Sequence, residues 1–147
     1  MKTLQELQVL ILQWAKEKDL LKFENAPKQR LKLLEEVGET AGAILKNKTS
    51  EIKDGIGDIF VVLVILSEQL SEEILFDMNG VAEDDDQDFI FLFDNIINPK
   101  RIYFSISYLN DICKKLNIDL TECANLAWNE IKDRTGQTID GTFIKNN

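Results

Sequence analysis

The sequence of 147 residues contains no histidine and only two cysteines and two prolines. The lack of histidine excludes Ser-His-Asp and Cys-His catalysis, imidazole-ligated zinc, and an imidazole that acts as acid, base or pH switch. Any chemistry must therefore use carboxylates, lysine, cysteine or a bound metal.

The two cysteines, Cys113 and Cys123, stand ten positions apart and outside any CxxC pattern. This spacing implies neither a disulfide framework nor a zinc knuckle. We expect both to be reduced, small residues of the core.

Basic residues are scarce as well: the chain has 17 Lys and Arg but 26 Asp and Glu, which gives a net charge of −9. Nucleic-acid binding needs clustered positive charge, so nucleic acid is not an expected partner. The longest strongly apolar stretch, Ile59 to Leu66, is far shorter than the roughly 20 residues that span a bilayer. The first residues also lack the basic and apolar regions of a signal peptide. We expect a cytoplasmic protein with no membrane partner.

Hydrophobic residues make up 44% of the chain and charged residues 29%, which is typical of a folded globular protein. The length suits one domain, and no repeat or low-complexity linker divides it. Apolar residues recur at steps of three and four along most of the chain. The expected helices cover residues 3–21, 27–46, 49–70, 101–116 and about 120–134.

Some local signals refine these helices. Asn25 and either Thr49 or Ser50 are the expected N-caps of the second and third helices. The third helix is apolar on every side between Ile59 and Leu66, so we expect it to be buried. Gly136 and Gly141 interrupt the segment after the last helix.

The segment from Ser71 to Lys100 follows a different pattern. Asn79-Gly80 indicates a turn, and Glu83 to Asp88 carries five acids in six positions, which is typical of a solvated loop. The next residues, Phe89 to Phe93, leave helix and strand open, but they are too apolar to stay exposed.

Five acids form the most informative pattern. Glu35, Glu36 and Glu39 share one face of the second helix, and Asp54 and Asp58 share one face of the third. A short turn between the helices predicts an antiparallel hairpin. At about 1.5 Å per residue, Glu39 and Asp58 then reach the same level.

Such a cluster of carboxylates is costly in a partly buried site unless the acids share protons or bind hard cations. Oxygen ligands suit Mg²⁺ or Mn²⁺, and Mg²⁺ keeps positions open for water and substrate phosphates. The pattern therefore favours a magnesium site with a phosphate substrate. The alternative is an ordinary solvated helix face.

Four glycines flank the acids, and each costs about 1 kcal/mol relative to alanine inside a helix. They suggest that backbones or a ligand approach closely there. These glycines are Gly38, Gly42, Gly55 and Gly57.

Four sequence fragments resemble the MazG-like family of all-α nucleotide pyrophosphohydrolases, over about Leu10 to Leu70 and Leu109 to Lys145. The fragments are Trp14-Ala15, Gln29-x-x-Lys32-Leu-x-Glu35-Glu36-x-Gly38-Glu39, Ile56-Gly57-Asp58 and Ala127-Trp-Asn129-Glu-Ile-Lys132-Asp-Arg134-x-Gly136. The resemblance implies one all-α domain, a bundle of about four to six helices with an acidic hairpin. It also implies a homodimer or homotetramer, with an insertion at about residues 71–100 as a cap or oligomer contact.

The family pattern is EExxE followed by ExxD, which holds Mg²⁺ against a nucleoside triphosphate. By resemblance, Glu36, Glu39 and Asp58 are metal ligands. The chain departs from the pattern at Gly55, where a glutamate is expected, and we expect Asp54 to replace it. A literal match at Glu51-x-x-Asp54 would shift the register by one turn.

The implied reaction cleaves a (d)NTP between its α and β phosphates and yields a (d)NMP and pyrophosphate, a reaction suited to nucleotide-pool housecleaning. A metal-bound water attacks phosphorus, and Glu35 or Glu36 orients it or accepts its proton. Glu39 and Asp58 complete the implied catalytic set.

Lys32, Lys132 and Arg134 are candidate phosphate ligands, although they could equally be surface residues. Asn129 could reach phosphate or sugar. Trp14 could stack on a base or belong to the core.

Two other hypotheses compete. The first is a non-catalytic helical binding or oligomerisation module of the same fold, which docks a partner through Phe89 to Phe93. The second, a di-iron carboxylate bundle, is disfavoured because such sites include Glu-x-x-His.

Overall fold

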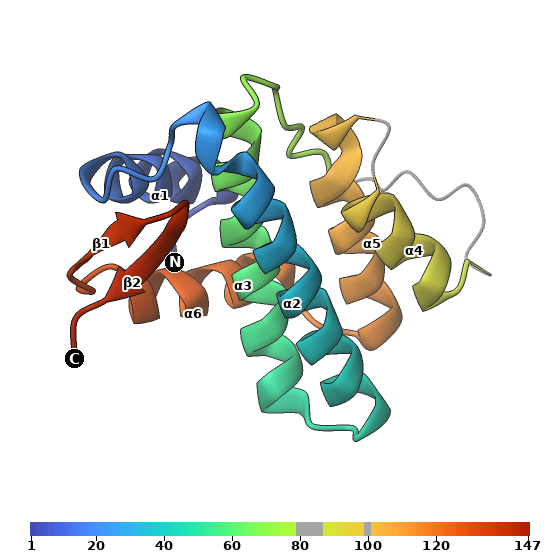
Figure 1. Ribbon diagram of the computed structural model, residues 1–147. Coiled ribbons are helices and arrows are strands. Elements are labelled where there is room, and N and C mark those ends of the chain that lie inside the picture. Colours follow the sequence, from blue (N-terminus) through green and yellow to red (C-terminus); the bar gives the residue numbers. More distant parts are fainter. Residues whose placement is uncertain (79–86, 99–100) are drawn as a thin grey trace.

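The computed structural model describes residues 1–78, 87–98 and 101–147 (Figure 1). This part of the chain forms six α-helices, two 3-10 turns and one antiparallel pair of strands, which confirms the predicted all-α bundle. The elements are α1 (Leu4–Glu17), η1 (Phe23–Asn25), α2 (Ala26–Leu45), α3 (Thr49–Gln69), α4 (Phe89–Ile97), η2 (Ile102–Phe104), α5 (Ser105–Leu116), α6 (Leu120–Ile131), β1 (Gly136–Ile139) and β2 (Thr142–Lys145).

The centre of the fold is the predicted antiparallel hairpin of α2 and α3, whose two long helices lie side by side in Figure 1. Helix α3 also packs against α1, α5 and α6. Its residues from Ile59 to Ser67 are all buried, because a helix that is apolar all round needs neighbours on every side. One of the two acidic stripes therefore lies on the buried central helix α3, and the other lies on α2, which packs against it.

The helix starts differ from the predicted caps. Thr3 caps α1 through a reciprocal capping box with Glu6. The expected cap of α2, Asn25, instead donates from its side-chain amide to the backbone oxygens of Asp19 and Leu20. Helix α3 begins at Thr49 itself, without a side-chain cap. Asn25 therefore stands at the predicted N-cap position of α2 but makes no side-chain capping bond, and the predicted cap of α3 at Thr49 or Ser50 is wrong because the helix already includes both residues.

Helix α4 resolves the open question at Phe89 to Phe93. The side chain of Asp88 accepts a hydrogen bond from the Phe91 backbone amide and caps this helix. Leu92 and Phe93 are buried, but Ile90 is 78% exposed and Phe91 is 40% exposed, so a single chain covers only part of the patch, and its role as an oligomer contact stays a prediction. The predicted turn at residues 79–80, most of the acidic run, and Pro99 lie outside the described residues.

The segment after α6 forms strands that the sequence interpretation did not include. Strands β1 and β2 pair in antiparallel register, with Gly136 opposite Lys145. The turn at Asp140 and Gly141 has positive φ at both residues, as a tight β-hairpin requires. The hydroxyl of Thr138 donates to the Lys18 backbone oxygen over 2.7 Å, which ties the hairpin to the end of α1.

The glycines divide into two pairs. A Cβ at Gly55 would collide with Thr40 of α2, and a Cβ at Gly57 would meet the Cys123 backbone oxygen and lie 2.9 Å from the Ala127 Cβ of α6. The predicted close approach is confirmed there. A Cβ at Gly38 or Gly42 would meet nothing within 4 Å among the described residues, so no neighbouring helix approaches these two, and the approach of a ligand there stays a prediction.

Both cysteines are free and buried, as expected. Burial raises the pKa of the Cys123 thiol to about 11, so the thiol form dominates near neutral pH. None of the described helices is long and apolar enough to cross a membrane.

We predict that Gly57→Ala lowers the free energy of unfolding by about 1–3 kcal/mol, because the added methyl group forces α3 away from α6. The measurement is urea unfolding followed by circular dichroism. The matched control is Gly38→Ala on α2, where the space is open and alanine favours the helix by about 0.5–1 kcal/mol. Equal effects of the two substitutions would contradict the packing argument.

Candidate functional site

A cavity of about 400 Å³ lies between the α2–α3 hairpin and the β1–β2 hairpin. One part of its wall is apolar and includes Trp14, Val62, Ile65 and Phe143. The other part is charged: it contains the carboxylates of Glu36 and Asp58 and the cations of Lys28, Lys32, Arg134 and Lys145. A ligand that fills this cavity would need an apolar portion and a charged portion.

Glu36 is the buried acid of the site, with 6% of its surface exposed. Its Oε1 lies 3.1 Å from the Lys32 Nζ, and its Oε2 is buried without a hydrogen-bond partner. Burial raises the pKa of Glu36 above its ordinary value, and Lys32 offsets part of this effect. A buried acceptor without a partner is rare and indicates a place for a cation or donor.

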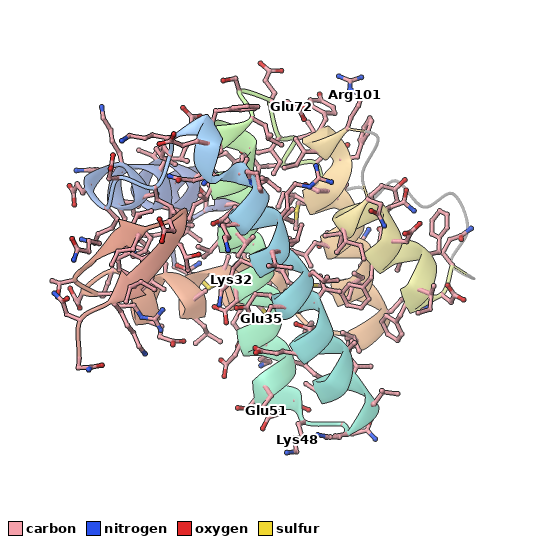
Figure 2. All side chains as sticks on the ribbon, in the orientation of Figure 1. Lys32, Glu35, Lys48, Glu51, Glu72 and Arg101 are labelled. Atoms are coloured by element: carbon pink, nitrogen blue, oxygen red, sulfur yellow. The ribbon has the colours of Figure 1, made fainter. Side chains whose placement is uncertain are left out.

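Lys32 lies between two acids one helical turn away. Its Nζ lies 2.6 Å from Glu35 Oε1, and Figure 2 shows these two side chains together on the α2–α3 hairpin. Although burial lowers the pKa of Lys32, its contacts with Glu35 and Glu36 raise it above the ordinary value overall. Glu35 itself is exposed and does not line the cavity.

Asp58 of α3 is half-buried and shares the cavity with Glu36. Burial raises the pKa of Asp58 to about 7, and the negative charges of Glu36, Glu130 and Asp54 add to the effect. The nearby Arg134 acts in the opposite direction. The site thus holds two carboxylates that are costly to ionise together.

The packing of the hairpin explains why Asp58 is paired with Glu36. Gly55 faces Thr40, so Asp58, three residues later on an antiparallel helix, lies level with Val37 and next to Glu36. Glu39, which was expected at the level of Asp58, is two residues from Val37 and therefore lies about half a helical turn away. The close contact at Gly55 shifts the helices relative to that estimate.

Glu39 and Asp54, the other two predicted metal ligands, are exposed and do not line the cavity. They lie near enough for the charge of Glu39 to raise the pKa of Glu36 and for that of Asp54 to raise the pKa of Asp58, and we call this position the rim of the cavity.

Of the other predicted substrate ligands, Trp14 and Arg134 line the cavity, whereas Asn129 and Lys132 are exposed outside it. Asn129 points away because it lies about half a turn from Ile131, whose side chain faces the cavity. Arg134 is held by Glu130, with 2.6 Å between its Nη2 and the Glu130 Oε1.

Several site residues were missed in the sequence. Lys28 lies one turn before Lys32 on the same face of α2, and Glu130 lies one turn before Arg134, so helical spacing alone could have found both. Phe143 and Lys145 required recognition of the Asp140-Gly141 hairpin signal.

The donor set fits a hard divalent cation: two carboxylates share a cavity, one oxygen lacks a partner, and the charges of two further acids act on this pair. Across residues 1–78, 87–98 and 101–147, no three acids or cysteines already converge as a complete ligand set. Glu36 and Asp58 would hold the ion, with Glu39 and Asp54 turning inward from the rim.

An all-α bundle with an acidic site on its central helical hairpin defines the class of protein. A profile of the MazG nucleotide pyrophosphohydrolase domain matches residues 9–85, just over half of the chain, and includes all five predicted acids. The chain belongs to this family. The matched region ends before α4, so the β1–β2 hairpin lies outside it.

The chain is also similar to an uncharacterized 18.2 kDa protein from the rep-hol intergenic region of Haemophilus phage HP1 (strain HP1c1). The two are 48% identical over 69 residues, which are 47% of this chain and 42% of that protein. The chain therefore spans less than half the length of this relative. No solved structure was found to match.

We predict that Asp58→Asn changes how stability depends on pH in protein kept free of metal by a chelator. The carboxyl group holds its proton more tightly when folded, so the free energy of unfolding of the unaltered protein falls as pH rises from 3.8 to about 7. The variant should lose much of this fall and be the more stable protein at pH 8. Thermal unfolding across pH 4–8 measures this.

The control for this experiment is Asp54→Asn, which removes an exposed acid one turn away on the same helix. It should change the pH profile much less. An Asp58→Asn profile parallel to that of the unaltered protein would contradict the assignment.

Proposed function

We propose that the protein is a Mg²⁺-dependent nucleoside triphosphate pyrophosphohydrolase that converts a (d)NTP to a (d)NMP and pyrophosphate. The main support is the cavity in which Glu36 and Asp58 share a wall, with one Glu36 oxygen lacking a partner. Four cations and an apolar wall in the same cavity complement phosphates and a nucleoside. Membership of the MazG family supports the reaction class.

Glu36 and Asp58 are the residues that would hold the metal, supported from the rim by Glu39 and Asp54. When bound, Mg²⁺ (or Mn²⁺) supplies charge neutralisation at the phosphate oxygens and a lower pKa for a coordinated water. This assignment explains why the chain keeps two like charges in one partly buried site.

The cations of the cavity would bind the phosphates. Arg134 is already oriented by Glu130, so its guanidinium loses little freedom when it binds an anion. Lys32 would turn from the Glu35–Glu36 pair towards phosphate. Glu35 would then be free of its 2.6 Å contact and could orient the attacking water or accept its proton.

A binding module without catalysis is the second candidate, and Gly55 favours it. A glutamate at this position, as the family pattern has it, would collide with Thr40. The close packing of α2 on α3 thus excludes one carboxylate of the pattern. Asp54, one residue earlier and exposed, is the side chain that could replace it.

We predict that Glu36→Gln and Asp58→Asn each lower kcat/KM for (d)NTP hydrolysis on the order of 100-fold or more, because both remove charge at the reacting phosphate. The measurement is release of pyrophosphate and monophosphate from a panel of (d)NTPs with Mg²⁺. Hydrolysis should stop when the metal is chelated.

The matched control is Glu51→Gln, which alters an exposed acid of the same helix. It should leave kcat/KM near that of the unaltered protein. If Glu51→Gln abolished activity and Asp58→Asn did not, the ExxD motif of the family would correspond to Glu51-x-x-Asp54, one turn earlier on α3. No turnover of any nucleotide would favour the binding module.

We also propose self-association, which the family resemblance implies. Leu31, Leu34 and Leu45 are exposed and share one face of α2, at the spacing of a helix–helix seam. A second copy would cover this face with its own identical face, which closes a two-fold dimer and leaves no unpaired surface. Two such dimers would form the tetramer.

We predict that Leu34→Glu converts the oligomer to a monomer, because a charge in the centre of an apolar seam loses its hydration. Light scattering after size-exclusion chromatography measures the mass. The control is Leu126→Glu, at an exposed leucine of α6. A monomeric unaltered protein at micromolar concentration would refute the proposal.

A further inference from the structure

The β1–β2 hairpin forms one wall of the cavity, although residues 70–135 separate it along the chain from the end of α3. Phe143 and Lys145 of β2 both line the cavity. Since side chains alternate along a strand, these two point to one face, and Ile144 between them points to the other. The hairpin therefore offers the cavity one ring and one cation.

The apolar part of the cavity contains a buried donor without a partner. Trp14 is only 8% exposed, and its indole Nε1 is buried with no hydrogen bond. The Phe143 ring meets the Trp14 ring edge to face, with 5.0 Å between centroids. The nearby Gln29 side chain, also buried, lines the same cavity and offers both a donor and an acceptor.

The cavity wall thus combines two kinds of chemistry. Its carboxylates and cations suit a metal-bound polyphosphate. Its aromatic pair and unpaired N–H group suit a flat heterocycle that carries acceptor atoms, since bases stack on aromatic rings and a buried donor is costly without an acceptor. Both line one cavity of about 400 Å³.

We infer that the β1–β2 hairpin is the nucleoside-binding wall of the site: the base lies against Phe143, the Trp14 indole N–H donates to an acceptor atom of the base, and Lys145 contacts the phosphate chain. This inference rests on the proposed function and adds the residues that hold the substrate's base. It also gives the hairpin, which lies outside the family match, a direct role in binding.

The test compares binding of a non-hydrolysable dNTP analogue with binding of inorganic tripolyphosphate, which has no base, by calorimetry in the presence of Mg²⁺. The variants are Phe143→Leu, which keeps an apolar side chain against Trp14 but removes the ring, and Lys145→Gln. Ile144→Ala, on the opposite face of the same strand, is the matched control. Circular dichroism and thermal unfolding check that each variant folds.

Phe143→Leu should weaken analogue binding on the order of 10-fold and leave tripolyphosphate binding unchanged. Lys145→Gln should weaken both ligands by a similar factor, and more at low salt than at high salt. Ile144→Ala should change neither. Trp14→Phe, which removes the indole N–H and keeps an aromatic ring, should weaken the analogue alone.

Equal weakening of both ligands by Phe143→Leu would overturn the base contact, as would an effect of Ile144→Ala as large as that of Phe143→Leu. If Phe143→Leu and Lys145→Gln both bound the analogue as the unaltered protein does, the hairpin would not be part of the binding site. The proposed function would still hold, because the unaltered protein binds the analogue. Failure of the unaltered protein to bind the analogue would instead overturn the proposed function, and this inference with it.

Discussion

The contact between Gly55 and Thr40 sets the geometry of the whole site. It lets α2 and α3 approach closely, and it fixes the register that brings Asp58 beside Glu36. Gly57, on the same helix, gives α6 an equally close approach, which brings Glu130 and Arg134 towards Asp58. Two absent Cβ atoms on α3 therefore determine which charges meet, and both lie within one turn of the acid that they position.

The packing that creates the site also makes it unfavourable without a ligand. Burial and neighbouring acids raise the pKa of Asp58 to about 7, and Glu36 keeps one oxygen without a partner. A protein gains no stability from this arrangement, because hydrophobic residues of similar size would fill the space at lower cost. Buried acids that are costly to the fold are typical of sites that perform chemistry.

The sequence predicted the central hairpin, the buried third helix and the acidic face, because strong apolar periodicity and i,i+4 spacing are local properties. It did not predict which acids meet, because a shift of two residues between helices depends on packing at Gly55 and Thr40. The strands were missed because two four-residue segments carry little periodicity, although Asp140-Gly141 is a recognisable turn. Asn129 and Lys132 lie near Arg134 in sequence but on a different side of the helix end.

The ion pairs of the site would link the proposed binding of metal and of phosphate. Lys32 is shared by Glu35 and Glu36, and Arg134 is held by Glu130, so two of the four cavity cations already have acidic partners. Lys32 can turn to a phosphate at low cost only when Glu36 has another positive partner. The same exchange works in reverse, since a phosphate that draws Lys32 away leaves both Glu36 oxygens open to a cation. By linkage, each ligand must then raise the affinity for the other by the same factor. Under the proposed function, the chain would therefore favour a nucleotide that arrives with its metal over either one alone.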